Sequence, residues 1–328
     1  MKKTLILIVA LIIATTTSHA QQVTATLNHN DTLTVFYGVY AFREACDASS
    51  DGDIISLSPG NFAGSSLSHN VTIIGAGMQK DSINNILPTI IMDDIKTKTN
   101  DNTIVYASIL LNKDASHIIL KNLRIENLYV NEHRPNIDAE KCYLQVAGTI
   151  NFLNLINCMV TKVNCKGINA INSYIINYSG DNNANIDFTK GFFNNCIISV
   201  KTGNEIQYST INNSIILNTS SYSLGNGLTI YNTLYLSENA EPLNVDVASN
   251  CWSLPQHTKI FKENTNHELL DEIRAKYIGT DGKEIGIYGG VCPFSPFPKS
   301  YQIIKCDVAS ETTPDGKLSV HIEVKSNE

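Results

Sequence analysis

The sequence has no cluster of lysine and arginine residues. Its 328 residues contain 24 Lys and Arg against 31 Asp and Glu, which gives a formal net charge of −7. Residues 1–20 hold two of the positive charges and no acid, so the charge of the remaining chain is lower by two, at −9. Binding to the phosphate backbone of nucleic acids requires clustered basic side chains. The composition therefore predicts that DNA and RNA are not partners.

Long apolar runs are missing beyond the N-terminus, and the run found there is short. Leu5–Ile13 is unbroken and apolar, but a membrane-spanning helix needs about 20 such residues. Two lysines precede this run, and Ser18-His19-Ala20 follows it with small residues at a cleavage point. This order is typical of a secretory signal peptide, although a buried N-terminal strand or helix is an alternative. We expect residues 1–20 to be removed and the protein to be exported, to the periplasm, the cell surface or the medium, without a membrane span.

The sequence also lacks the spacings by which cysteines and histidines commonly bind metals. Neither Cys-x-x-Cys nor His-x-x-x-His occurs, so we predict no metal centre of this kind. Cys158, Cys196 and Cys251 each follow an asparagine, and we expect them to be stacked, buried thiols. Cys292 and Cys306 flank a proline-rich turn, so they are the pair for which a disulfide is expected if one forms.

A repeated phrase in the middle of the chain decides the expected fold. Asparagine introduces a short β-rich run at positions 157, 172, 195, 213 and 232, in steps of 15, 23, 18 and 19 residues. A period near 20 residues predicts a solenoid, in which neighbouring coils cover each other's apolar surface. A leucine-rich repeat would need leucines at fixed offsets, and a β-sandwich would need hairpin turns. Asparagine tolerates the left-handed backbone of a turn, and we expect its amide to hydrogen-bond along a stack of identical residues.

The start of the β-rich region can cover the open end of such a solenoid. Val35–Ala48 can form an amphipathic helix, and Asp51–Phe62 has the pattern of two strands joined by a turn. Asn70–Gly77 supplies the next strand. An uncovered terminal coil would leave strand edges unpaired and core side chains bare. We therefore expect the helix to cap the N-terminal end.

These N-terminal segments resemble a known superfamily. Gly-Asp-x-Ile-x-Leu-x-Pro-Gly-x-Phe over 52–62, followed by Val-Thr-Ile-Ile-Gly-Ala-Gly over 71–77, is similar to the first coils of pectate-lyase-like proteins. The chain looks like an uncharacterised, exported bacterial branch of that superfamily, over residues 33–290. The resemblance implies an all-β fold, a right-handed parallel β-helix with an N-terminal capping helix and a short C-terminal β-hairpin tail.

We expect one β-helix domain over residues 21–292, followed by a proline-rich linker and a strand pair over 293–328. Near the end of the domain, Glu263–Lys276 has a helix-like pattern, and Asp281–Gly290 has the pattern of a turn and a closing strand. In the tail, two strands over 301–308 and 317–325 enclose a turn that contains Pro314-Asp315-Gly316.

The most charged insertion between the expected coils is residues 131–141. Loops that leave a rigid scaffold concentrate binding and catalytic residues, although a solvated loop without a site is the simpler alternative. A lyase on this scaffold would need a lysine or arginine base, for which Lys141 and Arg134 are the candidates. It would also need acidic Ca²⁺ ligands, and the cation is expected only under this hypothesis. The candidate binding residues are His133, Asp138, Glu140, Tyr129 and Tyr143.

Complete catalytic motifs are missing. The aspartate pattern and the basic-Pro-x-x-Arg strand of pectate lyases do not occur, and neither do the motifs of polygalacturonases and pectin methylesterases. Asp93-Asp94 is the only adjacent acid pair among the expected coils, whereas glycoside hydrolysis needs two or three carboxylates around the bond. Tyrosines recur from Tyr106 to Tyr235. Outward tyrosines would stack on sugar rings, and inward ones would belong to the core.

The scaffold without a catalytic set leads to three hypotheses. The first is a non-catalytic exported protein that binds a polysaccharide, a cell-surface glycan or another surface partner along one face, without a cofactor. The second is a polysaccharide lyase that cleaves acidic polysaccharide by β-elimination. The third is a structural or adhesive surface protein. The sequence leaves the ligand, the functional face and the oligomeric state open.

Overall fold

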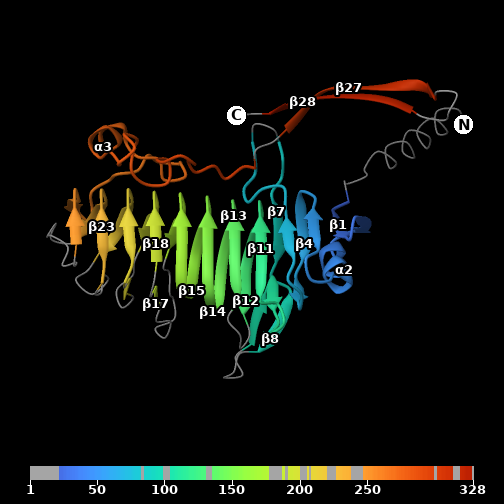
Figure 1. The fold of residues 1–328 in the computed structure, drawn as a ribbon, viewed down its shortest axis with the longest axis horizontal. Coiled ribbons are helices and arrows are strands. Elements are labelled where there is room, and N and C mark those ends of the chain that lie inside the picture. Colours follow the sequence, from blue (N-terminus) through green and yellow to red (C-terminus); the bar gives the residue numbers. More distant parts are fainter. Residues whose placement is uncertain are drawn as a thin grey trace, which may run out of the picture.

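The computed structural model describes most of the chain beyond residue 21. The described residues are 22–82, 85–98, 104–130, 135–176, 187–188, 191–199, 205–206, 208–219, 227–237, 247–298, 301–312 and 318–326. Among them, no helix is both long and apolar enough to cross a bilayer. Strands make up 53% and helices 6% of the structure, which forms a parallel β-solenoid of about eight turns. The predicted all-β parallel β-helix is therefore confirmed (Figure 1).

The coils stack three parallel sheets, which we call faces A, B and C. Each coil runs through face A, then face B, then face C, and β14 and β15 are long strands that bend around the corners. Face A consists of β3 (Ile54–Leu57), β6 (Thr72–Ile74), β11 (His117–Lys121), β13 (Asn136–Glu140), the last parts of β14 (Tyr143–Ile156) and β15 (Met159–Ile171), β18 (Gly191–Asn194), β21 (Thr210–Asn212), β23 (Thr229–Tyr231) and β25 (Val247–Ser249).

Faces B and C complete each coil. Face B consists of β4 (Gly60–Ala63), β7 (Thr89–Met92), the first parts of β12 (Arg124–Val130), β14 and β15, then β16 (Tyr174–Ile176), β19 (Ile197–Ser199), β22 (Ile215–Thr219), β24 (Leu234–Ser237) and β26 (Trp252–Pro255). Face C consists of β5 (Ser65–Leu67), β10 (Ile109–Leu111), the end of β12, the middle of β14 and β15, β17 (Asp187–Phe188) and β20 (Glu205–Ile206). An antiparallel hairpin, β8 (Ile95–Lys98) and β9 (Ile104–Ala107), projects between faces B and C.

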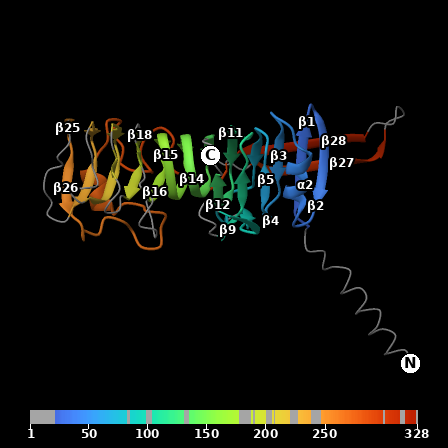
Figure 2. The ribbon, with the colours of Figure 1, turned by 90° about the horizontal axis from the view of Figure 1, so that it is seen from below.

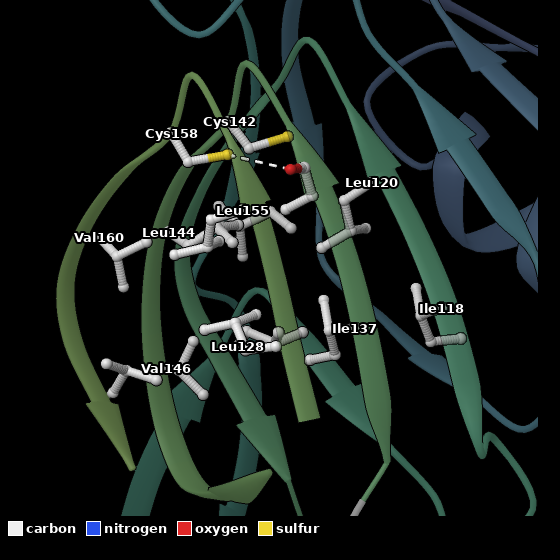
Figure 3. Close-up of a cluster of buried hydrophobic side chains, with 14 of the residues drawn as sticks. Ile118, Leu120, Leu128, Ile137, Cys142, Leu144, Val146, Leu155, Cys158 and Val160 are labelled. Carbon is white, nitrogen blue, oxygen red and sulfur yellow. Dashed lines mark hydrogen bonds between the residues drawn. The ribbon is translucent and has the colours of Figure 1, made fainter. Parts of the chain in front are cut away.

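The core lies inside the coils and is built from alternate residues of each strand. Successive side chains of a strand point to opposite faces, so β13 buries Ile137 and Ala139 and turns Asn136, Asp138 and Glu140 outward. Figure 3 shows the core around β13, where aliphatic side chains from neighbouring coils stack on one another. This stacking continues along the solenoid in one hydrophobic cluster.

The N-terminal end is capped by a hairpin and a helix. β1 (Thr24–His29) pairs antiparallel with β3, and β2 (Thr32–Tyr37) pairs antiparallel with β1. Helix α2 (Ala41–Ala48) buries Ala41, Phe42, Ala45 and Cys46 against the first coil. The capping helix is confirmed, but it begins later than the predicted Val35–Ala48. Asn30 and Asp31 adopt φ values of 48° and 62°, which make a tight hairpin turn, so the β-branched and aromatic residues after it form a strand.

The predicted asparagine column lies at the corner between faces A and B. Each residue of this column adopts a left-handed φ between 44° and 56°: Asn122, Lys141, Asn157, Asn172, Asn195, Asn213, Asn232 and Asn250. The backbone N–H of each residue from Asn122 to Asn232 bonds to a carbonyl of the next coil. Among residues with a side chain, asparagine has one of the lowest energy costs in the left-handed conformation, which explains its recurrence. We call this set the corner column.

The amides of the corner column do not stack on one another as predicted. Asn172 Nδ2 donates to the carbonyl oxygens of Ile287 (2.8 Å) and Gly289 (2.7 Å). Asn213 Nδ2 donates to Thr280 Oγ1 at 3.0 Å, and Asn157 Oδ1 accepts from the backbone N–H of Ser295 at 3.1 Å. The amides of Asn157, Asn172 and Asn213 therefore bind the C-terminal segment that runs along the corner, whereas the Asn195 amide has no hydrogen-bond partner among the described residues.

From Lys141 onward, the position after each corner residue carries a small side chain that points inward, whereas buried Leu123 follows Asn122. Cys142, Cys158 and Cys196 are buried there, Cys251 is half-buried, and serine or threonine occupies the coils between them. In Figure 3 the thiols of Cys142 and Cys158 lie in neighbouring coils, and Cys158 Sγ donates to the carbonyl oxygen of Ala139 at 3.3 Å. The predicted burial is thus confirmed for Cys158 and Cys196, whereas Cys251 is only partly buried. Cys292 has a free, exposed thiol, and the side chain of Cys306, its expected disulfide partner, lies outside the described residues.

The segment 256–298 covers face B instead of closing the last coil. Helix α3 (Asp271–Lys276) is shorter than the predicted Glu263–Lys276, and 281–290 forms turns, not the predicted strand, with φ of 74° to 83° at Gly282, Gly286 and Gly290. Ile260, Leu269, Ile273, Ile285, Ile287 and Phe294 from this segment pack on the outward side chains of face B and form a second hydrophobic cluster. Figures 1 and 2 show the segment running back along the solenoid.

The chain ends in an antiparallel hairpin of β27 (Tyr301–Thr312) and β28 (Leu318–Ser326). This confirms the predicted C-terminal strand pair. In Figure 1 the hairpin lies apart from the stacked coils, on the same side as the segment 256–298.

Candidate functional site

The structure distributes the predicted site residues over different parts of the coil. Asp138 and Glu140 lie on β13 and point outward from face A. Lys141 lies in the corner column, where its Nζ donates to the carbonyl oxygen of Phe297 at 3.0 Å. Arg134 and His133 lie outside the described residues. The candidate base and the candidate acids therefore have separate partners.

The two predicted tyrosines lie on other faces. Tyr143 begins β14 on face B, and the Arg124 guanidinium stacks over its ring at 4.4 Å from the centroid. Tyr129 lies on face C and is only 9% exposed. Neither tyrosine shares a face with Asp138 and Glu140, so the structure does not gather the predicted binding residues into one cluster.

Face A carries a charged patch on its third and fourth strands, β11 and β13. Asp138 Oδ2 lies 2.8 Å from His117 Nε2, and Asp138 Oδ1 accepts from Asn154 Nδ2 at 2.5 Å. Further along the same two strands, Lys121 Nζ lies 3.3 Å from Glu140 Oε2. Each charged group thus has an opposite partner in the neighbouring coil. Ion pairs this exposed contribute about 0–1 kcal/mol to stability, so the patch mainly balances its own charge.

Beyond the charged patch, face A presents aromatic rings and amides. Phe152, Phe192 and Tyr231 point outward and are 39%, 44% and 37% exposed, while the residue after or before each of them is buried in the core. Between them lie the amides of Asn154, Asn169, Asn194 and Asn212, which are half-buried, and Asn212 Nδ2 donates to Asn194 Oδ1 at 3.3 Å. We call these seven residues the aromatic–amide strip.

Face B offers no comparable surface, because the segment 256–298 lies over it. Tyr174 points outward from face B, yet its ring contacts His267 with centroids 4.0 Å apart, and burial raises the pKa of Tyr174. Tyr235 points into the core, and Tyr178 and Tyr222 lie outside the described residues. Of the recurring tyrosines with a described orientation, Tyr231 belongs to the uncovered face A.

A second group of polar side chains lies where faces B and C meet. Ser108 Oγ donates to Asp93 Oδ1 at 2.5 Å. Asp94 accepts from the backbone N–H of Gly64 (2.6 Å) and pairs with Arg43 on α2 (2.8 Å). Burial of its carboxyl raises the pKa of Asp93, as do the charges of Glu126 and Asp94, and the bond from Ser108 opposes them. These contacts brace the capping helix and the first coils.

The aromatic–amide strip was missed in the sequence, although its positions follow a simple rule. The side chains one and three residues before Asn157, Asn195 and Asn232 point outward on face A, and so does the side chain five residues before Asn157. Phe152 lies five residues before Asn157, Phe192 three before Asn195, and Tyr231 one before Asn232. Counting backward from each corner asparagine would therefore have identified the three rings.

Metal binding and relationships to known proteins add no further site. Within the described part of the chain, no group of three or more His, Cys, Asp or Glu side chains is arranged to hold a metal ion. Comparisons of the chain with protein-family models, with curated proteins and with solved structures gave no match. The functional interpretation rests on the geometry of face A.

Proposed function

We propose that the protein is an exported, pectate-lyase-like β-helix protein that binds glycan along face A without catalysis. The observation that carries this proposal is the aromatic–amide strip on the uncovered face of a rigid solenoid. Aromatic rings stack on the apolar faces of sugar rings, and side-chain amides both donate to and accept from hydroxyl groups. A row of both residue types on one flat surface fits an extended carbohydrate.

The contacts of the predicted catalytic residues support binding over lyase chemistry. A lyase base must reach a proton of the substrate within hydrogen-bonding distance. The Lys141 ammonium group is bound to the Phe297 carbonyl at the corner, and Asp138 and Glu140 pair with His117 and Lys121 on face A. Among the described residues, no single surface presents Lys141 together with Asp138 and Glu140.

Export is part of the proposal and rests on the N-terminal sequence. The basic start, the apolar run Leu5–Ile13 and the small residues at Ser18 and Ala20 have the order of a signal peptide. Mass spectrometry of the protein purified from a bacterial host would test this, and a mature chain that begins at Gln21 is the expected result. A chain that retains Met1 and stays in the cytoplasm would contradict it.

The binding proposal can be tested with soluble polysaccharides of both charge classes. Affinity electrophoresis against xylan, galactomannan, polygalacturonate and alginate would show which of them retards the protein. Phe192→Ala should markedly reduce the retardation because Phe192 lies in the middle of the strip. Tyr106→Ala is the matched control: Tyr106 is 53% exposed but belongs to the β8–β9 hairpin. Equal behaviour of the two variants, or no retardation of the wild-type protein, would contradict binding on face A.

The same samples distinguish binding from cleavage. A lyase product carries an unsaturated sugar that absorbs ultraviolet light, so absorbance should stay constant when the protein is incubated with the acidic polysaccharides. A rise in absorbance would establish the lyase alternative. Lys141→Ala and Asp138→Asn would then show whether the predicted base and acid take part.

A further inference from the structure

The three exposed rings of face A are regularly placed along a diagonal. Phe152 lies on β14, opposite Gly167 of the next coil. Phe192 lies two coils beyond Phe152, opposite Asn169, and Asn169 is two residues further along its strand than Gly167. In the coil after Phe192, Thr210 is its partner, and Asn212 lies two residues further along that strand. Tyr231 is opposite Asn212 in the following coil, so it lies two coils beyond Phe192. Each step thus advances two coils and two residues.

This register fixes the spacing of the rings. Neighbouring strands are about 4.8 Å apart and residues along a strand rise by about 3.3 Å, so each step advances about 10 Å along the solenoid and about 7 Å across it. The rings are therefore about 12 Å apart along a straight oblique line. A single sugar is too short to reach from one ring to the next. A linear chain of several sugars can stack one sugar on each of the three aromatic rings.

The amides lie where such a chain would pass between the rings. Asn169 is the neighbour of Phe192 in the preceding coil, and Asn194 is two residues further along the same strand as Phe192. Asn212 is directly opposite Tyr231 and donates to Asn194. Each interval between rings therefore has amide groups that can bond to the hydroxyls of sugars that do not stack.

The strip carries no charge in its described side chains. From β14 to β23, the outward residues of face A that the structure describes are Phe152, Asn154, Ile156, Gly167, Asn169, Ile171, Phe192, Asn194, Thr210, Asn212, Thr229 and Tyr231. Among the described residues of face A, the charged side chains lie on β11 and β13, where they pair with one another. An acidic polysaccharide would need lysine or arginine partners. The surface fits a ligand without charge.

We infer that face A binds a linear, uncharged glycan that crosses the coils obliquely and stacks on Phe152, Phe192 and Tyr231 in turn. This inference rests on the proposed function and adds the class of ligand, its direction and the number of contacts. It predicts a binding site several sugars long. It also predicts that the three rings contribute jointly, because one chain must touch all of them.

Calorimetric titration with neutral oligosaccharides of increasing length, prepared from whichever neutral polysaccharide retards the protein, tests the inference. Affinity should rise with length until the chain reaches all three rings, and then level off. Phe152→Ala, Phe192→Ala and Tyr231→Ala should each weaken binding of the longest oligosaccharide about tenfold. Phe192→Tyr should bind like the wild type, and raising the salt concentration should leave the affinity unchanged.

The outcomes separate this inference from the proposed function. If no polysaccharide binds, or if Tyr106→Ala weakens binding as much as Phe192→Ala, binding on face A is wrong. If binding is lost in Phe192→Ala but Phe152→Ala and Tyr231→Ala bind like the wild type, glycan binding stands and the oblique path is wrong. Preference for polygalacturonate or alginate, with affinity that falls as salt is added, would overturn the uncharged ligand class. Melting temperatures of all variants show whether each remains folded.

Discussion

Lys141 and Phe297 are joined by a hydrogen bond across 156 residues of sequence, from Lys141 Nζ to the Phe297 carbonyl oxygen at 3.0 Å. Lys141 has a φ of 51° and occupies the corner position that asparagine fills in neighbouring coils. In the next coil, Asn157 binds Ser295 of the same C-terminal segment. At this corner, lysine therefore forms the hydrogen bond to the C-terminal segment that asparagine forms at Asn157, and its longer side chain reaches further to that segment.

Replacing Lys141 should affect stability and leave ligand binding unchanged. Lys141→Ala removes one hydrogen bond to a partly buried carbonyl, which we expect to lower the free energy of unfolding by about 1 kcal/mol. Lys141→Asn introduces the residue type that best tolerates the left-handed backbone, so this variant should be more stable than Lys141→Ala. Urea unfolding of the three proteins measures the difference. Unchanged stability with lost binding or lost product formation would instead assign Lys141 to a functional site.

Asn172 should be among the most sensitive positions of the corner column. Its side chain is 1% exposed and donates to two carbonyl oxygens of the C-terminal segment. Asn172→Ala leaves both carbonyls without this donor and places alanine in the left-handed region, at a combined cost of about 3 kcal/mol. The matched control is Asn232→Ala, with the same backbone conformation (φ 44°) and no side-chain hydrogen bond among the described residues. The control should lose about 1 kcal/mol, and equal losses would show that the amide contacts contribute nothing.

The sequence was informative wherever local conformation decides the structure. A left-handed corner excludes most side chains, so the corner column appears directly as recurring asparagine. The packing of the segment 256–298 on face B leaves no such signal. Its buried residues, among them Ile260, Leu269, Ile285 and Phe294, are widely spaced in a turn-rich stretch, and their burial depends on a surface provided by distant coils.

The predicted site failed to assemble for a related reason. The sequence pattern predicts one charged insertion over residues 131–141, but residues 136–140 form β13, whose alternation directs Asp138 and Glu140 outward and Ile137 inward. The left-handed turn at Lys141 then directs its side chain toward the C-terminal segment. Side chains that are neighbours in this sequence are separated in space, because the strand alternates their direction and the sharp corner turns the chain away.

Alkaline pH should destabilise the protein through its buried thiols. Burial raises the pKa of Cys46, Cys165 and Cys196 from 9.0 to about 12. In the unfolded chain these thiols ionise near pH 9, whereas in the folded protein they stay protonated, so rising pH favours the unfolded state. The stabilisation is complete below pH 9 and is lost progressively between pH 9 and 12. Urea unfolding at pH 8, 9 and 10 should show this decline.

Cys196→Ser tests the contribution of one thiol to that decline. Serine fits this position, because Ser173 and Ser214 fill the equivalent positions in the coils before and after it, and serine does not ionise in this range. The variant should lose less stability between pH 8 and pH 10 than the wild-type protein. An identical pH dependence would show that Cys196 does not carry the effect.

Chelation of divalent cations should change neither the stability of the protein nor its affinity for a neutral glycan. Both carboxylate oxygens of Asp138 are engaged, by His117 at 2.8 Å and Asn154 at 2.5 Å, and Glu140 pairs with Lys121 at 3.3 Å. A Ca²⁺ site needs six to eight oxygen ligands, and these two carboxylates would have to give up their partners to supply a minority of them. Melting temperature and oligosaccharide affinity measured with EDTA and with added Ca²⁺ provide the check. Binding that disappears with EDTA, returns with Ca²⁺ and is absent in Asp138→Asn would place a calcium site on β13 and revive the lyase hypothesis.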